Sequence, residues 1–232
     1  MMILESTYAG MFAGTVTNLR KKAIELEDEI KPYFLAPFMT LPIPEEAPKE
    51  FPRLIASSPN NHSQMAISND RISLSTRYDS EYWNNWDMCR EYMDERVRLA
   101  DEMVRLLGAK ILFRGIVLRL CWEESEPVTL LEDKFLKCRG DYHDLALKLT
   151  KSTKDDIYKN IMLSSVRGYP NAPFDDRLPE TFIGIEAMID VNTRLASNYR
   201  RQSSLGALDL LMQLNTIVSL DILSLIKEGI WL

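Results

Sequence analysis

The residues best suited to chemistry are four acids in the second half of the chain. Asp155 and Asp156 are adjacent, and Glu186 and Asp190 lie four residues apart on one face of a predicted strand. Grouped carboxylates hold the divalent cation of metal-dependent nucleases and phosphodiesterases. Four residues of strand span about 13 Å, which is too far for Glu186 and Asp190 to share one ion. A metal-dependent nuclease or phosphodiesterase that uses these four acids is therefore our second hypothesis.

Other catalytic signals are scarce. The chain has two histidines, His62 and His143, and no group of histidines and cysteines with the spacing of zinc ligands. Neither a glycine-rich phosphate loop nor a GxSxG nucleophile motif occurs. We therefore expect no catalytic residue, no metal and no cofactor, and a protein that is not an enzyme.

Two arginines interrupt the most apolar predicted strand, residues 110–122. Both faces of this strand are apolar, which predicts a central position in a sheet. Arg114 and Arg119 fall on opposite faces, and a buried charge needs an opposite charge or access to solvent. We expect at least one of them to form a structural ion pair with Glu186 or Asp190.

Arginines on a predicted helix over residues 80–107 give a third hypothesis. Arg90, Arg98 and Arg105 could contact the phosphates of a nucleic acid, which would make the protein a nucleic-acid-binding adaptor. However, the 28 basic and 34 acidic residues are interspersed and give a net charge of −6. A broadly basic surface is therefore not expected, and the composition does not indicate nucleic-acid binding.

Length and composition indicate a globular protein. The chain has 232 residues, of which 46% are hydrophobic and 27% charged, enough for a full core without disulfides. We expect a single α+β domain over residues 1–232, with two sub-lobes, 1–125 and 126–232, as the alternative. The odd number of cysteines (Cys89, Cys121 and Cys138) favours a reducing, cytoplasmic location.

The order strand, helix, strands occurs twice among the predicted elements at a coarse level, although the sequence itself contains no internal repeat. Alternating or apolar segments predict strands over residues 3–16, 110–122, 143–151, 157–169 and 181–193. A hairpin with Asn69 and Asp70 as its turn would place Ile67 opposite Ile72 and Met65 opposite Leu74. Helices are predicted over residues 18–31, 80–107 and 204–228, and a short one over about residues 128–136. The predicted fold is a mostly antiparallel sheet packed against two long helices, 80–107 and 204–228.

The last of these helices has an unusually wide apolar surface. Polar residues within it, among them Asp209 and Asp221, argue against a membrane span. Apolar residues cover more of the circumference than one sheet face can bury, so part of them should stay exposed and contact a partner. The residues predicted for this interaction lie beside the main stripe: Leu210, Leu214, Ile217 and Leu225.

A proline-rich connector, residues 37–52, lies between the first helix and the hairpin. It contains five prolines and is predicted to be extended. Such a segment either packs against its own domain or is presented to a partner.

Several distinctive segments follow one another in a characteristic order over nearly the whole chain. They are Phe51-Pro52-Arg53-Leu54, the hairpin strand 67–74, the aromatic cluster Tyr82-Trp83-Asn84-Asn85-Trp86, the arginine strand 113–119 and the acidic strand 185–191. In this order they resemble a sporadically distributed bacterial family of functionally uncharacterised proteins of about this length. The resemblance implies an α+β fold and assigns no catalytic residue. The patchy distribution of that family implies a role in antiviral defence or in another mobile gene cluster.

Together these features favour a cytoplasmic, non-enzymatic protein that binds a protein partner or forms a homo-oligomer. No membrane association is expected.

Overall fold

The structure, a computed structural model, describes residues 1–44, 46–137, 140–153, 157–167, 182–193 and 205–231. Its strands are β1 (Met2–Phe12), β2 (Met39–Thr40), β3 (Leu54–Ser57), β4 (Ser63–Ile67), β5 (Arg71–Arg77), β6 (Ile111–Glu123), β7 (Ala146–Ser152), β8 (Ile157–Arg167) and β9 (Ile183–Thr193). Its helices are α1 (Leu19–Ile30), α2 (Trp86–Leu106), α3 (Pro127–Phe135), α4 (Ala207–Thr216), the π-helical turn η1 (Ile217–Asp221) and α5 (Ile222–Glu228).

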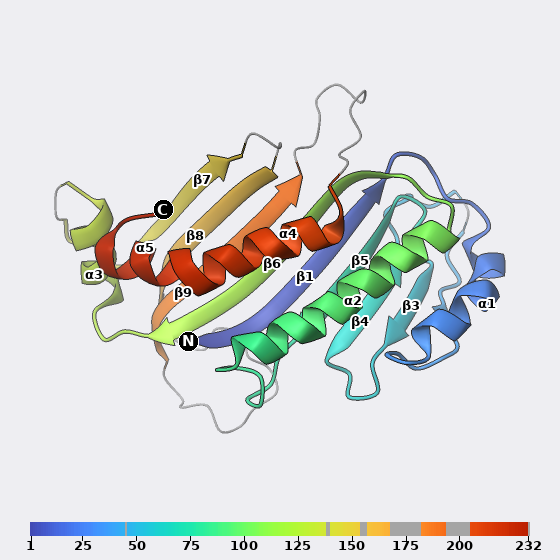
Figure 1. Ribbon diagram of the computed structural model, residues 1–232, viewed down its shortest axis with the longest axis horizontal. Coiled ribbons are helices and arrows are strands. Elements are labelled where there is room, and N and C mark those ends of the chain that lie inside the picture. Colours follow the sequence, from blue (N-terminus) through green and yellow to red (C-terminus); the bar gives the residue numbers. More distant parts are fainter. Residues whose placement is uncertain (45, 138–139, 154–156, 168–181, 194–204, 232) are drawn as a thin grey trace.

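The strands form one antiparallel sheet in the order β2-β3-β4-β5-β1-β6-β9-β8-β7 (Figure 1). The α+β class and the antiparallel sheet predicted from the sequence are therefore confirmed. The predicted central strand, β6, lies near the middle of the sheet between β1 and β9.

The chain folds as two halves with the same element order. In each half the first strand pairs with the last strand of a meander, β1 with β5 and β6 with β9, and a long helix follows. The two first strands, β1 and β6, pair with each other and join the halves into one sheet. The halves divide between Leu106 and Ile111, earlier than the boundary at residue 125 considered above. One hydrophobic core cluster contains residues of both halves.

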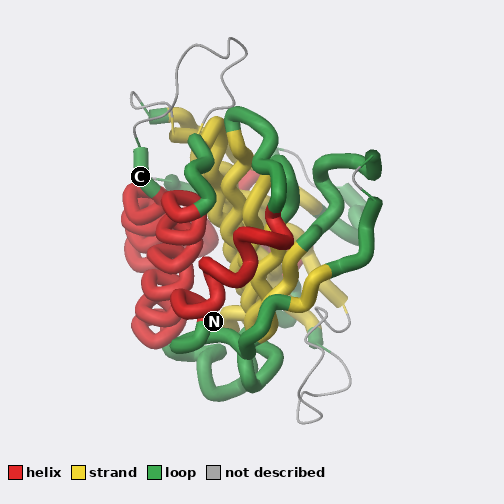
Figure 2. The backbone as a smooth tube through the Cα atoms, turned by 90° about the vertical axis from the view of Figure 1, so that its right-hand side faces the viewer, coloured by secondary structure: helices red, strands yellow, loops and turns green. Residues whose placement is uncertain are grey.

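The helices lie mainly on one face of the sheet. Figure 1 shows α2 over the first half and the C-terminal helix over the second half, and Figure 2 shows helices packed as a layer on one side of the strands. The expectation of two long helices is met only in part. The helix α2 has 21 residues, whereas the C-terminal helix consists of α4, η1 and α5 in succession, and α1 and α3 are additional helices.

The hairpin has the predicted register. Met65 pairs with Leu74 and Ile67 with Ile72, and the backbone N–H of Ser68 donates to Arg71 O, which leaves Asn69 and Asp70 as the turn. The strand β3, which follows the proline-rich connector, was not predicted. Its four residues are too short for a clear alternating pattern, and its partners β2 and β4 fix its position.

The helix α2 begins later than predicted. Residues 80–84 form turns, and Asn85 is the N-cap, because its side chain accepts a hydrogen bond from the Met88 backbone N–H at 3.2 Å. Before this helix, Asp79 Oδ1 accepts a hydrogen bond from the Glu81 N–H within the turn.

The C-terminal helix buries the residues that were predicted to contact a partner. Leu210, Leu214 and Ile217 are 0% exposed and Leu225 is 1% exposed. The expectation of an exposed patch at these positions is wrong, because the helix contacts the sheet on one side and α2 and α3 on others, so a wide arc is buried. The π-helical turn adds a residue that rotates the downstream face. The apolar side chains that point outward are Met212, Leu220 and Leu223.

By length and composition, the helix from Ala207 to Glu228 could also cross a membrane, although half of its most apolar window is buried in this structure. A core helix that packs on a sheet is buried to a similar degree.

Candidate binding groove between α2 and α4

A groove of about 760 Å³ runs between α2 and α4 on their solvent side. The two helices lie side by side and run in opposite directions (Figure 1). Residues of both helices line it: Arg90, Glu91, Asp94, Glu95 and Arg98 from α2, and Leu208, Asp209, Leu211, Met212 and Asn215 from α4.

The wall from α2 carries alternating charges. Arg90, Asp94 and Arg98 are spaced by four residues and therefore follow one face of the helix. Arg98 Nε and Nη2 donate to the two carboxylate oxygens of Asp94 at 2.7 and 3.3 Å, and this hydrogen bonding raises the pKa of Arg98. Arg90 Nη2 lies 3.6 Å from an Asp87 oxygen.

The wall from α4 is mainly apolar. Leu211 is buried at the base, Leu208 is half-buried, and Met212 is 60% exposed. Asp209 is the only acid on this wall, and its Oδ2 accepts a hydrogen bond from the Gly206 backbone N–H at 2.7 Å. The carboxylate therefore stabilises the N-terminus of α4, where the helix dipole also favours negative charge.

Polar contacts tie the two helices together near both ends of the groove. At one end, Trp86 Nε1 donates to Asn215 Oδ1 at 2.8 Å. At the other, Arg114 of β6 donates to the Leu205 carbonyl at 2.8 Å and lies 3.4 Å from Asp101 of α2. These contacts hold the walls at a defined separation, which makes the groove a preformed feature.

A buried arginine supports the α2 wall from below. Arg96 is 7% exposed and lies between the rings of Tyr33 and Tyr92, with its guanidinium carbon 4.4 and 4.2 Å from the ring centroids. Its Nη1 donates to Glu95 Oε2 at 3.1 Å. Arg96 therefore anchors α2 to the turn that follows α1 by its cation–π contact with Tyr33, and it orients an acid of the groove.

The groove as a whole has acidic character. Its lining contains the carboxylates of Glu91, Asp94, Glu95 and Asp209 but only two guanidinium groups, which leaves a net charge of −2. An apolar strip beside an acidic wall suits an amphipathic segment that carries basic residues.

Two acids of the nuclease hypothesis, Glu186 and Asp190, lie on the sheet face opposite the helices, and their side chains form hydrogen bonds. Arg119 Nε donates to Glu186 Oε1 at 2.8 Å, the ion pair expected for one of the two strand arginines. Asp190 accepts from the side-chain amides of Asn160 and Asn192 instead of from an arginine. Asp155 and Asp156 lie outside the described residues.

Among the described residues, no three acids, histidines or cysteines are grouped as metal ligands. The arrangement of Glu186 and Asp190 therefore gives no support to a metal centre built on them.

The arginines of the nucleic-acid hypothesis are paired along α2. Arg90 and Arg98 contact Asp87 and Asp94, and Arg105 donates to Glu102 within the same helix turn. Because each guanidinium lies beside a carboxylate, this face presents little net positive charge to a phosphate backbone.

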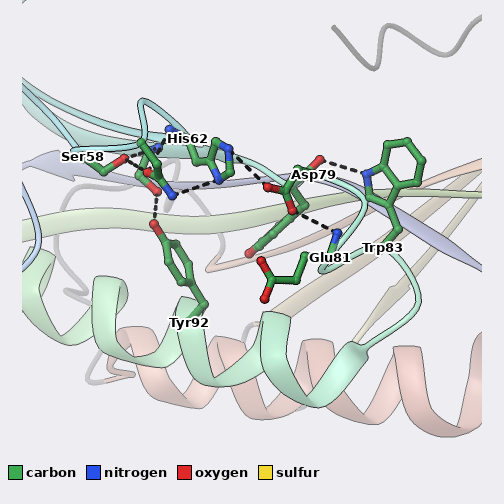
Figure 3. Close-up of polar contacts among 9 residues, drawn as sticks. Ser58, His62, Asp79, Glu81, Trp83 and Tyr92 are labelled. Atoms are coloured by element: carbon green, nitrogen blue, oxygen red, sulfur yellow. Dashed lines mark hydrogen bonds and ion pairs between the residues drawn. The ribbon is translucent and has the colours of Figure 1, made fainter. Parts of the chain in front are cut away.

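A polar cluster around His62 joins the β3–β4 turn to the segment before α2 (Figure 3). The His62 Nδ1 lies 3.1 Å from Asn60 Nδ2, and its Nε2 lies 3.5 Å from Asp79 Oδ2. Nearby, Ser63 Oγ lies 2.8 Å from the Tyr92 hydroxyl of α2. Since both ring nitrogens of His62 already face partners, the cluster positions α2 and offers no free base for catalysis.

The two described cysteines are also unsuited to chemistry. Cys89 and Cys121 are free and buried, and burial raises the pKa of each thiol to about 12. A thiol with such a pKa is almost entirely protonated at neutral pH and is a poor nucleophile.

No model of a known protein family and no curated protein matches this chain.

The charged face of α2 was evident from the sequence, but the groove was not. The α4 wall of the groove includes Leu208 and Met212, two apolar residues that nothing in the sequence distinguishes from the other apolar residues of this helix. Asn215, a single amide in an apolar helix, was the available signal, because a polar residue in such a helix often has a specific partner.

Proposed function

We propose that this protein is a non-enzymatic binding component that holds a segment of a protein partner in the groove between α2 and α4. The observation that carries the proposal is the pairing of an apolar strip, Leu208, Leu211 and Met212, with a net acidic wall in a preformed groove of about 760 Å³. A short segment can bury its apolar side chains in such a groove, and a few of these contacts supply most of the binding energy.

The partner segment is an amphipathic helix with leucine-like residues on one face and lysine or arginine at its margins. Its apolar face would cover Met212, whose side chain is 60% exposed, and its basic residues would approach Glu91 and Glu95. Because the charges at the margin remain solvated, they contribute mainly to the rate of association and to specificity.

We place this binding component in the bacterial cytoplasm and in a defence or other mobile gene cluster. The free thiols of Cys89 and Cys121 support a reducing compartment. The order of segments that resembles the sporadically distributed bacterial family supports the genetic setting.

The test uses a fluorescein-labelled helical peptide with leucines on one face and lysines on the other, and a second peptide with glutamate in place of lysine. Fluorescence anisotropy should show binding of the lysine peptide that weakens with added salt, and much weaker binding of the glutamate peptide. Equal binding of both peptides would remove the electrostatic basis of the proposal.

Two matched variants locate the binding site. Met212→Asp places a carboxylate in the groove and should weaken binding of the lysine peptide by about tenfold or more, because an apolar contact is replaced by a charge that must be desolvated. Leu223→Asp changes a side chain that is also exposed, at 51%, on the same helix but outside the groove lining. It should leave binding unchanged, and equal losses in both variants would contradict the assignment.

A further inference from the structure

The two edges of the sheet differ in how they are protected. At one edge, β2 has two residues and is flanked by Pro37, Pro42 and Pro44, which cannot donate backbone hydrogen bonds. At the other edge, β7 has seven residues and contains no proline. Only the β7 edge is long enough to form a regular ladder with another strand.

The internal duplication shows what the β7 edge lacks. In the first half, the meander ends at β3, and the proline-rich connector adds β2 as a further antiparallel strand beside it. In the second half, β7 is the strand equivalent to β3. Within the described ranges, no strand occupies the position beyond it. The fold thus accepts an added strand beside β3 in one half, whereas no strand of the described residues lies beside β7 in the other.

The backbone groups along this edge can be assigned from the ladder with β8. Ser165 N donates to Leu145 O and Thr153 N donates to Ile157 O, so odd-numbered residues of β7 face β8. Because these groups alternate along a strand, the N–H and C=O groups of the even-numbered residues point outward. These residues, all exposed, are Ala146, Lys148, Thr150 and Ser152.

The side chains of β7 define the chemistry of a strand that would pair there. Lys148 lies on the sheet face opposite the helices, and β7 contains Lys151 as a second cation and no acid. On the helix face, Leu147 and Leu149 are half-buried, and Trp231 stacks against Lys151 with its ring centroid 4.7 Å from Nζ. Lysines on an edge oppose pairing with a second copy, because like charges would come close together, and they favour an acidic strand.

We propose that the β7 edge binds an extended segment of a protein partner as an antiparallel tenth strand, in which apolar and acidic residues alternate. The acidic side chains face Lys148, and the apolar side chains extend the layer of Leu147 and Leu149. The backbone groups of Lys148 and Thr150 supply main-chain hydrogen bonds, as in other cases of strand addition. This surface is separate from the groove between α2 and α4.

The probe is a short fluorescein-labelled peptide in which valine and glutamate alternate, and its binding is measured by anisotropy. Thr150→Pro removes an outward N–H without removing a bond to β8, and Thr150→Ala is the matched control, because both variants lose the hydrogen bond from the Thr150 hydroxyl to Asn160. We expect Thr150→Pro to weaken binding by about tenfold or more relative to Thr150→Ala. Equal affinities of the two variants, or no binding to the parent protein, would overturn the proposal.

Further measurements keep the test independent of the stability of Thr150→Pro. A peptide N-methylated at alternate residues keeps its side chains but loses backbone donors, and it should not bind to the parent protein. Lys148→Glu should reverse the charge preference toward a valine–lysine peptide. Met212→Asp should bind the valine–glutamate peptide normally, which separates this surface from the groove. A parent dimer that Thr150→Pro converts to a monomer would identify a second copy as the occupant and refute the partner strand.

Discussion

Arg119 Nε donates to Glu186 Oε1 at 2.8 Å and thereby joins two neighbouring strands, β6 and β9, on the sheet face opposite the helices. The same guanidinium lies 3.4 Å from Glu5 of β1. One arginine therefore connects the two halves of the molecule at the centre of the sheet, and it neutralises an acid from each half.

Replacing this arginine should destabilise the protein. Arg119→Met leaves Glu5 and Glu186 without their shared cation, and we expect a loss of ~1–3 kcal/mol in the free energy of unfolding, because both partners are only partly exposed. Urea denaturation measures it. Adding Glu186→Met to this variant should recover part of the loss. Unchanged stability of both Arg119→Met and Arg114→Met would contradict the structural role of the strand arginines.

The outward and inward sides of the C-terminal helix should respond oppositely to charge. Leu214→Glu combined with Ile217→Glu buries two unpaired carboxylates, at a cost of about 3 kcal/mol or more for each, which is comparable with the whole stability of a typical domain. This variant should be unfolded by circular dichroism.

Leu220→Glu combined with Leu223→Glu is the matched control, because these side chains are 65% and 51% exposed. It should remain folded, and light scattering should show a monomer even if the parent chain associates through this apolar row. A folded Leu214/Ile217 variant would mean that the helix does not pack on the sheet as described.

The hairpin turn should contribute stability that depends on pH. Hydrogen bonding to the Arg71 guanidinium, together with a contribution from Ser68, lowers the pKa of Asp70 below its ordinary value of 3.8. Because the unfolded chain binds the proton more readily, this contribution is present above that ordinary value and is lost as the pH falls through the lowered pKa.

Urea denaturation at several values between about pH 3 and pH 6 measures this effect. The difference in stability between the parent and Asp70→Asn should shrink toward the acid end. A difference that does not depend on pH would contradict the role of Asp70.

Cys89 and Cys121 should be unreactive in the folded protein. Since burial raises each pKa to about 12, the thiolate that attacks iodoacetamide is scarce at about pH 8. Mass spectrometry should find both residues unmodified in buffer and fully alkylated in guanidinium chloride. Alkylation of either residue in buffer at the rate of a free thiol would show that its side chain is accessible.

Local chemistry was sufficient to predict several elements of this fold. A two-residue Asn69-Asp70 turn between alternating strands leaves one register that places Met65, Ile67, Ile72 and Leu74 on the same face, and the structure has that register. The periodicity of residues 18–31 similarly predicted α1, and the apolar faces of residues 110–122 predicted a central strand. In each case, neighbours along the chain contain the information.

The groove and the buried side of the C-terminal helix depend on contacts between distant segments. The apolar surface of residues 204–228 indicated how much area must be buried. It did not indicate that the sheet, α2 and α3 all bury part of this surface. The exposed side was therefore assigned wrongly to Leu210, Leu214, Ile217 and Leu225. The charged face of α2 was evident from the sequence. Its position beside Leu208 and Met212 follows from the pairing of β1 with β6, which brings the two halves together. Such pairing depends on the summed packing of the whole sheet, and no single segment of the sequence encodes it.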